Sequence, residues 1–200
     1  MIESPYRTAG WIAIVQAILF PISMVVGIVQ GIAARAMLGR GGVMVGPADL
    51  GMLIFTLLSV YVLWTFRRLL NERYACHDLD TLLTVCIVWN VVTQLLTLAG
   101  GTIFMLSGRV PQPLMLMWAM GIFALFMISG GVINILVAVQ LFRLKDQLNE
   151  TIHVYGWICM IAGVCQLTLI LSPVAAILMP VACVVMALIF FREKDELEFV

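Results

Sequence analysis

Long apolar stretches separated by short polar segments make up most of the chain. A helix of about 20 mostly apolar residues crosses the hydrocarbon core of a bilayer, because about 30 Å is covered at about 1.5 Å per residue. The pattern therefore predicts an all-α polytopic bundle that forms a single integral membrane domain over residues 1–200. The predicted spans are residues 11–34, 49–66, 81–106, 114–142, 153–171 and 173–191.

Only Ser172 separates the last two predicted spans; Pro173 begins the second of them, and Pro180 interrupts it. Proline lacks a backbone N–H and disfavours helical geometry in the residue before it. A tight hairpin between two spans therefore suits this region better than one overlong helix. The sequence predicts six spans, and five spans are the alternative.

The distribution of Lys and Arg discriminates between these two topologies. With six spans and a cytoplasmic N-terminus, eight of the eleven Lys and Arg residues lie inside and three lie outside; with five spans the contrast falls to six against five. Positive residues are retained on the cytoplasmic side of a membrane. The pattern therefore favours six spans with both termini in the cytoplasm, in a bacterial-type cytoplasmic (inner) membrane.

Composition supports the membrane class and limits the partners. The chain is 63% hydrophobic and 11% charged, whereas soluble domains are about a quarter charged. Its formal net charge is zero, so nothing in the total charge indicates nucleic acid as a partner. The five cysteines show no metal-binding spacing, and we interpret them as small polarizable packing residues.

Two basic segments on the predicted cytoplasmic side resemble each other. Residues 66–77 and 142–153 both contain Phe-Arg, then Leu-Asn-Glu, then His; an internal repeat and chance similarity are both open interpretations. If the second span continues as a helix past the membrane, Arg68 and Glu72 can meet at i,i+4 spacing. We expect the segments to grip anionic lipid headgroups or to dock a cytoplasmic or membrane protein partner. The predicted interaction face comprises Arg67, Arg68, Asn71, Glu72, Arg143, Asn149 and Glu150.

Amide side chains are the main polar groups inside the apolar stretches, and no Asp, Glu, Lys or Arg lies deep in any of them. The absence of an ionisable group argues against proton-coupled transport, which usually needs one inside the membrane. Amides in spans commonly hold helices together through hydrogen bonds. The alternative is a polar path for a substrate, lined by Asn90, Gln94, Asn134 and Gln166.

His77 and His153 are the only histidines, and each lies at the predicted cytoplasmic mouth of a span. Two neutral imidazoles at similar depth could hold a metal or a haem. An interfacial structural role is the alternative, and we expect no cofactor because no histidine lies deep in a span.

Close helix packing is indicated by glycines in the first span. Gly27 and Gly31 form a GxxxG motif, which serves either packing within the chain or formation of a homo-oligomer.

The sequence contains no phosphate-binding loop, HExxH or GxSxG motif. We therefore expect a non-enzymatic accessory, partner-binding or lipid-binding component of a membrane complex, or a small transporter. The alternative is a membrane redox subunit with haem or metal on His77 and His153.

Overall fold

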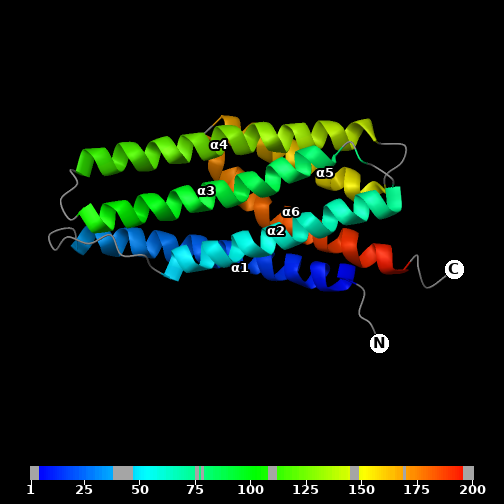
Figure 1. Cartoon of the computed structure of the whole chain (residues 1–200), viewed down its shortest axis with the longest axis horizontal. Coiled ribbons are helices and arrows are strands. Elements are labelled where there is room, and N and C mark those ends of the chain that lie inside the picture. Colours follow the sequence, from blue (N-terminus) through cyan, green and yellow to red (C-terminus); the bar gives the residue numbers. More distant parts are fainter. Residues whose placement is uncertain are drawn as a thin grey trace.

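The described part of the chain folds into helices that lie roughly along one common direction (Figure 1). The structure is a computed structural model, and it describes residues 5–37, 47–74, 77, 79–107, 112–144, 149–168 and 170–195. The helices are α1 (Pro5–Met37), α2 (Pro47–Tyr74), α3 (Asp80–Ser107), α4 (Gln112–Arg143), α5 (Glu150–Leu167) and α6 (Ser172–Asp195). The predicted all-helical class is confirmed for these residues.

Five of the described helices, α1, α2, α3, α4 and α6, are long and apolar enough to cross a membrane. The remaining helix, α5, has 18 residues, which corresponds to a length of about 27 Å. It also carries Glu150, His153 and Gln166, which lower its apolar character. Each predicted apolar stretch therefore forms a helix and the membrane class is supported, while the number of spans stays a prediction.

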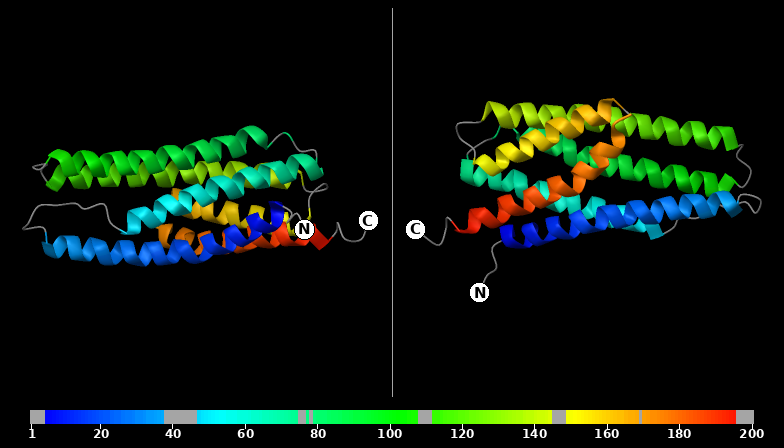
Figure 2. Two further views of the ribbon diagram at one scale, coloured as in Figure 1. Left: turned by 60° about the horizontal axis from the view of Figure 1, so that its bottom comes forward. Right: turned by 180° about the vertical axis from the view of Figure 1, so that it is seen from behind.

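The turn between α5 and α6 lies earlier than the expected Ser172-Pro173 corner. Helix α5 ends at Leu167, with Thr168 as its C-cap, and α6 already begins at Ser172. Pro173 is thus in the first turn of α6, where a missing backbone N–H removes no helical hydrogen bond. The resulting hairpin turns back part-way along the longer α4, as the right-hand view of Figure 2 shows.

The first and last described helices meet at one end of the bundle. The start of α1 packs beside the end of α6 (Figure 2), and the rings of Trp11 and Phe191 are 5.5 Å apart. Helix α4 packs closely along α5, and α1 packs closely along both α2 and α6, whereas the consecutive helices α3 and α4 contact each other only sparsely. The bundle is therefore least tightly closed between α3 and α4.

The most completely buried large side chains gather near the end of the bundle that holds both described termini. Phe66 has no exposed surface, and its ring contacts those of Tyr155 at 5.7 Å and Phe190 at 6.5 Å. Leu69 and Leu141 are also fully buried. Dispersion contacts of this kind stabilise helix association in lipid, where apolar surface gains nothing from leaving water. Many apolar side chains remain exposed on the outside of the bundle, as a lipid-facing surface requires.

Glycines allow one very close helix crossing. A Cβ atom on Gly163 of α5 would lie 2.8 Å from the backbone oxygen of Gly131 on α4, closer than real Cβ atoms approach. The predicted Gly27 position is less demanding, because a Cβ there would meet Ala48 of α2 at an ordinary 3.7 Å. Gly27 thus contributes to packing within the chain, and the surroundings of Gly31 lie outside the described part.

Candidate functional site

A central cavity of about 150 Å³ is lined by side chains from all six described helices. A cavity of about this volume in a protein core can hold a molecule the size of benzene. Most of the wall is apolar, and the uncharged polar side chains stand out within it. The polar residues on the wall include Gln16, Ser59, Trp89, Asn90, Asn134 and Gln166.

The close α4–α5 crossing sets one pair of amides on the cavity wall. Asn134 and Gln166 each follow a crossing glycine by three residues, Gly131 and Gly163 respectively, so they lie about one helical turn beyond the crossing. The Nδ2 atom of Asn134 donates a hydrogen bond to Oε1 of Gln166 at 3.0 Å. The two helices approach closely enough for short amides to meet, and each of these two amide atoms is satisfied.

A second polar pair joins α1 to α2. Gln16 is 2% exposed, and its Nε2 atom donates to Oγ of Ser59 at 2.6 Å and to the backbone oxygen of Phe55 at 3.3 Å. A buried amide without such partners would be costly. This pair therefore both holds two helices together and adds polarity to the cavity wall.

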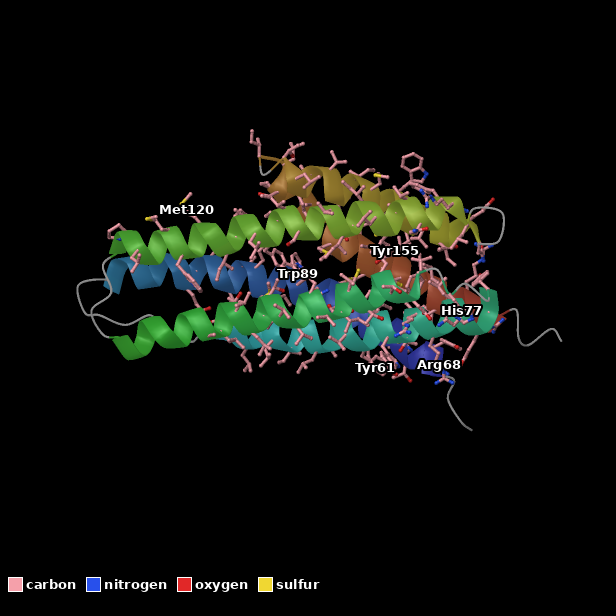
Figure 3. The ribbon with its side chains drawn as sticks, turned by 45° about the horizontal axis from the view of Figure 1, so that its top comes forward. Tyr61, Arg68, His77, Trp89, Met120 and Tyr155 are labelled. Atoms are coloured by element: carbon pink, nitrogen blue, oxygen red, sulfur yellow. The ribbon has the colours of Figure 1, made fainter. Side chains whose placement is uncertain are left out.

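Helix α3 contributes the least satisfied polar group of the cavity. Asn90 donates to the backbone oxygen of Cys86 in its own helix at 2.8 Å. The indole N–H of Trp89 is buried and has no hydrogen-bond acceptor among the described residues. Leaving a buried donor unsatisfied costs about 1–3 kcal/mol. In the view of Figure 3, Trp89 lies in the space between the ribbons of α3 and α4, and it shares the cavity wall with Phe126 and Ile133 of α4.

The predicted polar path is brought together in part. Asn90, Asn134 and Gln166 line the cavity, whereas Gln94, one turn farther along α3, is not among its lining residues. Sequence reasoning left out Gln16, although its amide within an apolar stretch was a usable signal. Trp89 carried no signal, because an aromatic residue in an apolar span is indistinguishable from a packing residue.

The cavity wall is electrically neutral in the part that the structure describes. None of its described lining residues is Asp, Glu, Lys, Arg or His. The thiols of Cys86, Cys159 and Cys183 lie on the wall and form no disulfide. Such a site suits an uncharged ligand, since an ion would lose its hydration there without gaining a charged partner.

The α2 part of the predicted interaction face forms a polar cluster with α3, just beyond the apolar stretches of both helices. Nε of Arg67 and Oδ1 of Asp80 are 2.8 Å apart, and Nδ2 of Asn71 donates to both Asp80 oxygens, at 2.8 and 3.0 Å. His77 Nδ1 is 3.6 Å from Asp80. The hydrogen bond from Arg67 is the main reason that the pKa of Asp80 falls from 3.8 to about 2. These side chains thus tie α2 to α3.

The predicted i,i+4 pair is confirmed. Helix α2 continues to Tyr74, and Nε of Arg68 lies 2.6 Å from Oε1 of Glu72. The hydroxyl of Tyr6 on α1 also donates to Glu72. The pair is exposed, so its main effect is to join α1 to the end of α2 rather than to add much stability.

The α4–α5 part of the predicted face is more open. Arg143 and Glu150 are exposed. Asn149 is the N-cap of α5, but its side chain makes no capping hydrogen bond; instead its backbone oxygen accepts from the N–H of Ile152 at 2.9 Å. The face therefore consists of an internally bonded α2 half and an exposed α4–α5 half.

The two histidines have different surroundings. His77 lies beside Asp80, whereas His153 lines a shallow pocket with Phe142, Glu150 and Trp157. Among the described residues, no three His, Cys, Asp or Glu side chains gather in a way that could hold a metal ion. The haem or metal site on these histidines stays a prediction.

The fold and the cavity together define the class of the protein: a helical bundle of the membrane type with a neutral polar site at its centre. Comparisons with family models, with curated proteins and with solved structures found no match to the chain.

Proposed function

We propose that this chain is a non-enzymatic multi-pass protein of a bacterial inner membrane, with both termini in the cytoplasm, that binds a small uncharged molecule in its central cavity. The observation that supports the proposal is that all six described helices contribute to one cavity whose polar groups are all uncharged. If the centre of the bundle had only a packing role, we would expect apolar side chains to fill it, because empty space forfeits dispersion contacts.

None of the described residues that line the cavity is Asp, Glu, Lys, Arg or His, and this also limits the mode of action. Proton-driven and ion-driven carriers usually hold a charged residue within the membrane. A neutral wall of amides and an indole favours simple equilibrium binding, as in a ligand-binding component of a membrane complex or a small uncoupled carrier.

Filling the cavity tests the proposal. A Cβ atom on Gly130 of α4 would lie 3.5 Å from Oε1 of Gln166 on the cavity wall, whereas a Cβ on Gly121 of the same helix would meet nothing within 4 Å. We expect Gly130→Phe to abolish binding of a small neutral probe, 4-fluoroacetophenone, and Gly121→Phe to leave it unchanged. Binding is measured by fluorine NMR on protein in nanodiscs.

Wild-type affinity should be about millimolar, as expected for a ligand of about ten heavy atoms. A thermal unfolding curve shows that each variant is folded. Absence of binding to the wild type, or equal binding to both glycine variants, would contradict the proposal.

A second proposal concerns the charged end of the bundle, where anionic lipid headgroups would bind. It is supported by exposed arginines on four different helices, Arg7, Arg68, Arg143 and Arg192. Anionic headgroups are attracted to such a basic surface. Reversing two of these charges, in Arg68→Glu with Arg143→Glu, should lower the phosphatidylglycerol that co-purifies with the protein, measured by mass spectrometry. An unchanged amount in the folded variant would count against lipid binding at this face.

A further inference from the structure

Trp89 limits the chemistry of the ligand. Its indole Nε1 is a donor only, it is buried, and none of the described residues accepts its hydrogen bond. Buried polar atoms in folded proteins nearly always have a partner. Since Trp89 lies on the wall of the central cavity, the missing acceptor belongs to whatever occupies that cavity.

The rest of the wall calls for an apolar body on the same ligand. Phe126, Ile133, Leu178 and Met186 line the cavity between its polar groups. Two of the amide donors are already engaged, Gln16 with Ser59 and Asn134 with Gln166. A ligand made entirely of polar groups would therefore lose more hydrogen bonds to water than the site returns.

The packing of α3 against α4 indicates where such a ligand enters. These are the consecutive helices with the sparsest contact, and in the view of Figure 3 Trp89 lies in the space between their ribbons. Toward the end of α3, the indole of Trp118 on α4 lies against Gly100 so closely that a methyl group there would clash. Trp118 thus bridges α3 and α4 at one end of this seam, while the α3 residues on the cavity wall lie nearer the start of the helix, between Leu83 and Asn90.

We propose that the ligand is a small amphipathic molecule dissolved in the bilayer, about the size of one substituted aromatic ring. It enters between α3 and α4, and its acceptor oxygen accepts a hydrogen bond from the indole N–H of Trp89. The inference rests on the proposed function, since it assumes that the central cavity binds a small molecule. It assigns the ligand to the lipid phase, and it makes Trp89 the residue that selects for the acceptor.

Two fluorinated probes of nearly the same shape test the role of Trp89. 4-Fluoroacetophenone carries a carbonyl oxygen where 4-fluoro-α-methylstyrene carries a CH₂ group. Binding of each to the protein in nanodiscs is measured by fluorine NMR. We expect the ketone to bind about tenfold more tightly than the alkene, because only the ketone satisfies the buried donor.

Trp89→Phe keeps an aromatic ring and removes the donor. In this variant we expect the ketone and the alkene to bind with about equal dissociation constants. Trp157→Phe is the matched control, because Trp157 is 60% exposed on α5 and does not line the cavity, and it should keep the tenfold preference.

The outcomes separate this inference from the proposed function. If neither probe binds the wild type, the cavity is not a ligand site and both ideas fail. If both probes bind equally to wild type and to Trp89→Phe, a small-molecule site remains but the assignment of Trp89 is overturned; an ordered water on the indole would give this result.

Entry from the bilayer is tested by opening the seam. Trp118→Ala removes the bridge to Gly100, so the exchange rate of bound 4-fluoroacetophenone should rise several-fold while its dissociation constant stays the same. An unchanged exchange rate in a folded Trp118→Ala variant would overturn entry between α3 and α4.

Discussion

The α4–α5 crossing offers the sharpest test of the packing that forms the site. In Gly163→Ala, the new Cβ atom would lie 2.8 Å from the backbone oxygen of Gly131 and 3.1 Å from the backbone nitrogen of Ile135. Ordinary contact begins at 3.4 Å, so α5 must retreat by about 0.6 Å, the difference between 3.4 and 2.8 Å. Backbone atoms cannot rotate away as a flexible side chain can.

The magnitude follows from two opposing effects. Overpacking a tight interface costs about 1–3 kcal/mol, and the upper part of this range applies because backbone atoms form the obstacle. Alanine in place of glycine inside a helix returns about 1 kcal/mol, so we expect a net loss near 2 kcal/mol. Gly121→Ala is the control: nothing lies within 4 Å of its Cβ position, so it should stabilise by up to about 1 kcal/mol.

The same retreat should also disrupt the amide pair in the cavity. The bond from Asn134 to Gln166 is 3.0 Å long, and lengthening it by about 0.6 Å takes it outside hydrogen-bonding distance. We therefore expect Gly163→Ala to weaken probe binding in addition to lowering stability, although neither the glycine nor its neighbour Gly131 carries a polar side chain.

A thiol-reactive dye provides the assay, because Cys159 and Cys165 on α5 are buried and free and become reactive when the bundle opens. A difference of about 3 kcal/mol between the two alanine variants corresponds to about 6–12 °C in Tm at about 2–4 °C per kcal/mol. Equal melting temperatures for Gly163→Ala and Gly121→Ala would refute the reasoning about the crossing.

Two further predictions concern the polar pairs. The pKa of Asp80 is lowered from 3.8 to about 2 by Arg67, so its stabilising effect is fully present above about pH 4 and is lost as the pH falls toward 2. Asp80→Asn should lower Tm at pH 7 and remove its acid dependence in that window; an unchanged dependence would show that other groups cause it. Gln16→Leu should cost about 1 kcal/mol because it leaves Ser59 without its partner, and adding Ser59→Ala should cost little more, as measured by unfolding of both variants.

The helices could be predicted from the sequence because long apolar runs have few other stable forms in a membrane. The end of α5 could not. The turn after Leu167 contains the apolar residues Ile170 and Leu171. Its C-cap, Thr168, is no stop signal in the sequence, because threonine also occurs inside the helices, as Thr97 does in α3. Apolar run length therefore overestimated α5, and the short α5–α6 hairpin became visible only in the packed structure.

The site was partly predictable for a related reason. An amide inside an apolar helix must find a partner, so amides on different helices tend to face one another, and Asn134 with Gln166 follows this rule. The rule does not say how far along a helix the cavity extends when two amides lie one turn apart on the same face. Asn90 lines the cavity and Gln94 does not, because the cavity ends within the turn of α3 that separates them.

Hydrogen-bond satisfaction then distinguishes the walls of the cavity from one another. The polar groups on α1, α2, α4 and α5 that are described above bond across helix pairs, Gln16 to Ser59 and Asn134 to Gln166. On α3, Asn90 bonds only within its own helix and Trp89 has no acceptor among the described residues. Helix α3 thus combines two features: its contact with α4 is sparse, and its Trp89 presents an unused hydrogen-bond donor to the cavity. A ligand that bonded to Trp89 would supply part of the α3–α4 contact that the bundle lacks, so ligand binding should stabilise the fold as well as fill the cavity.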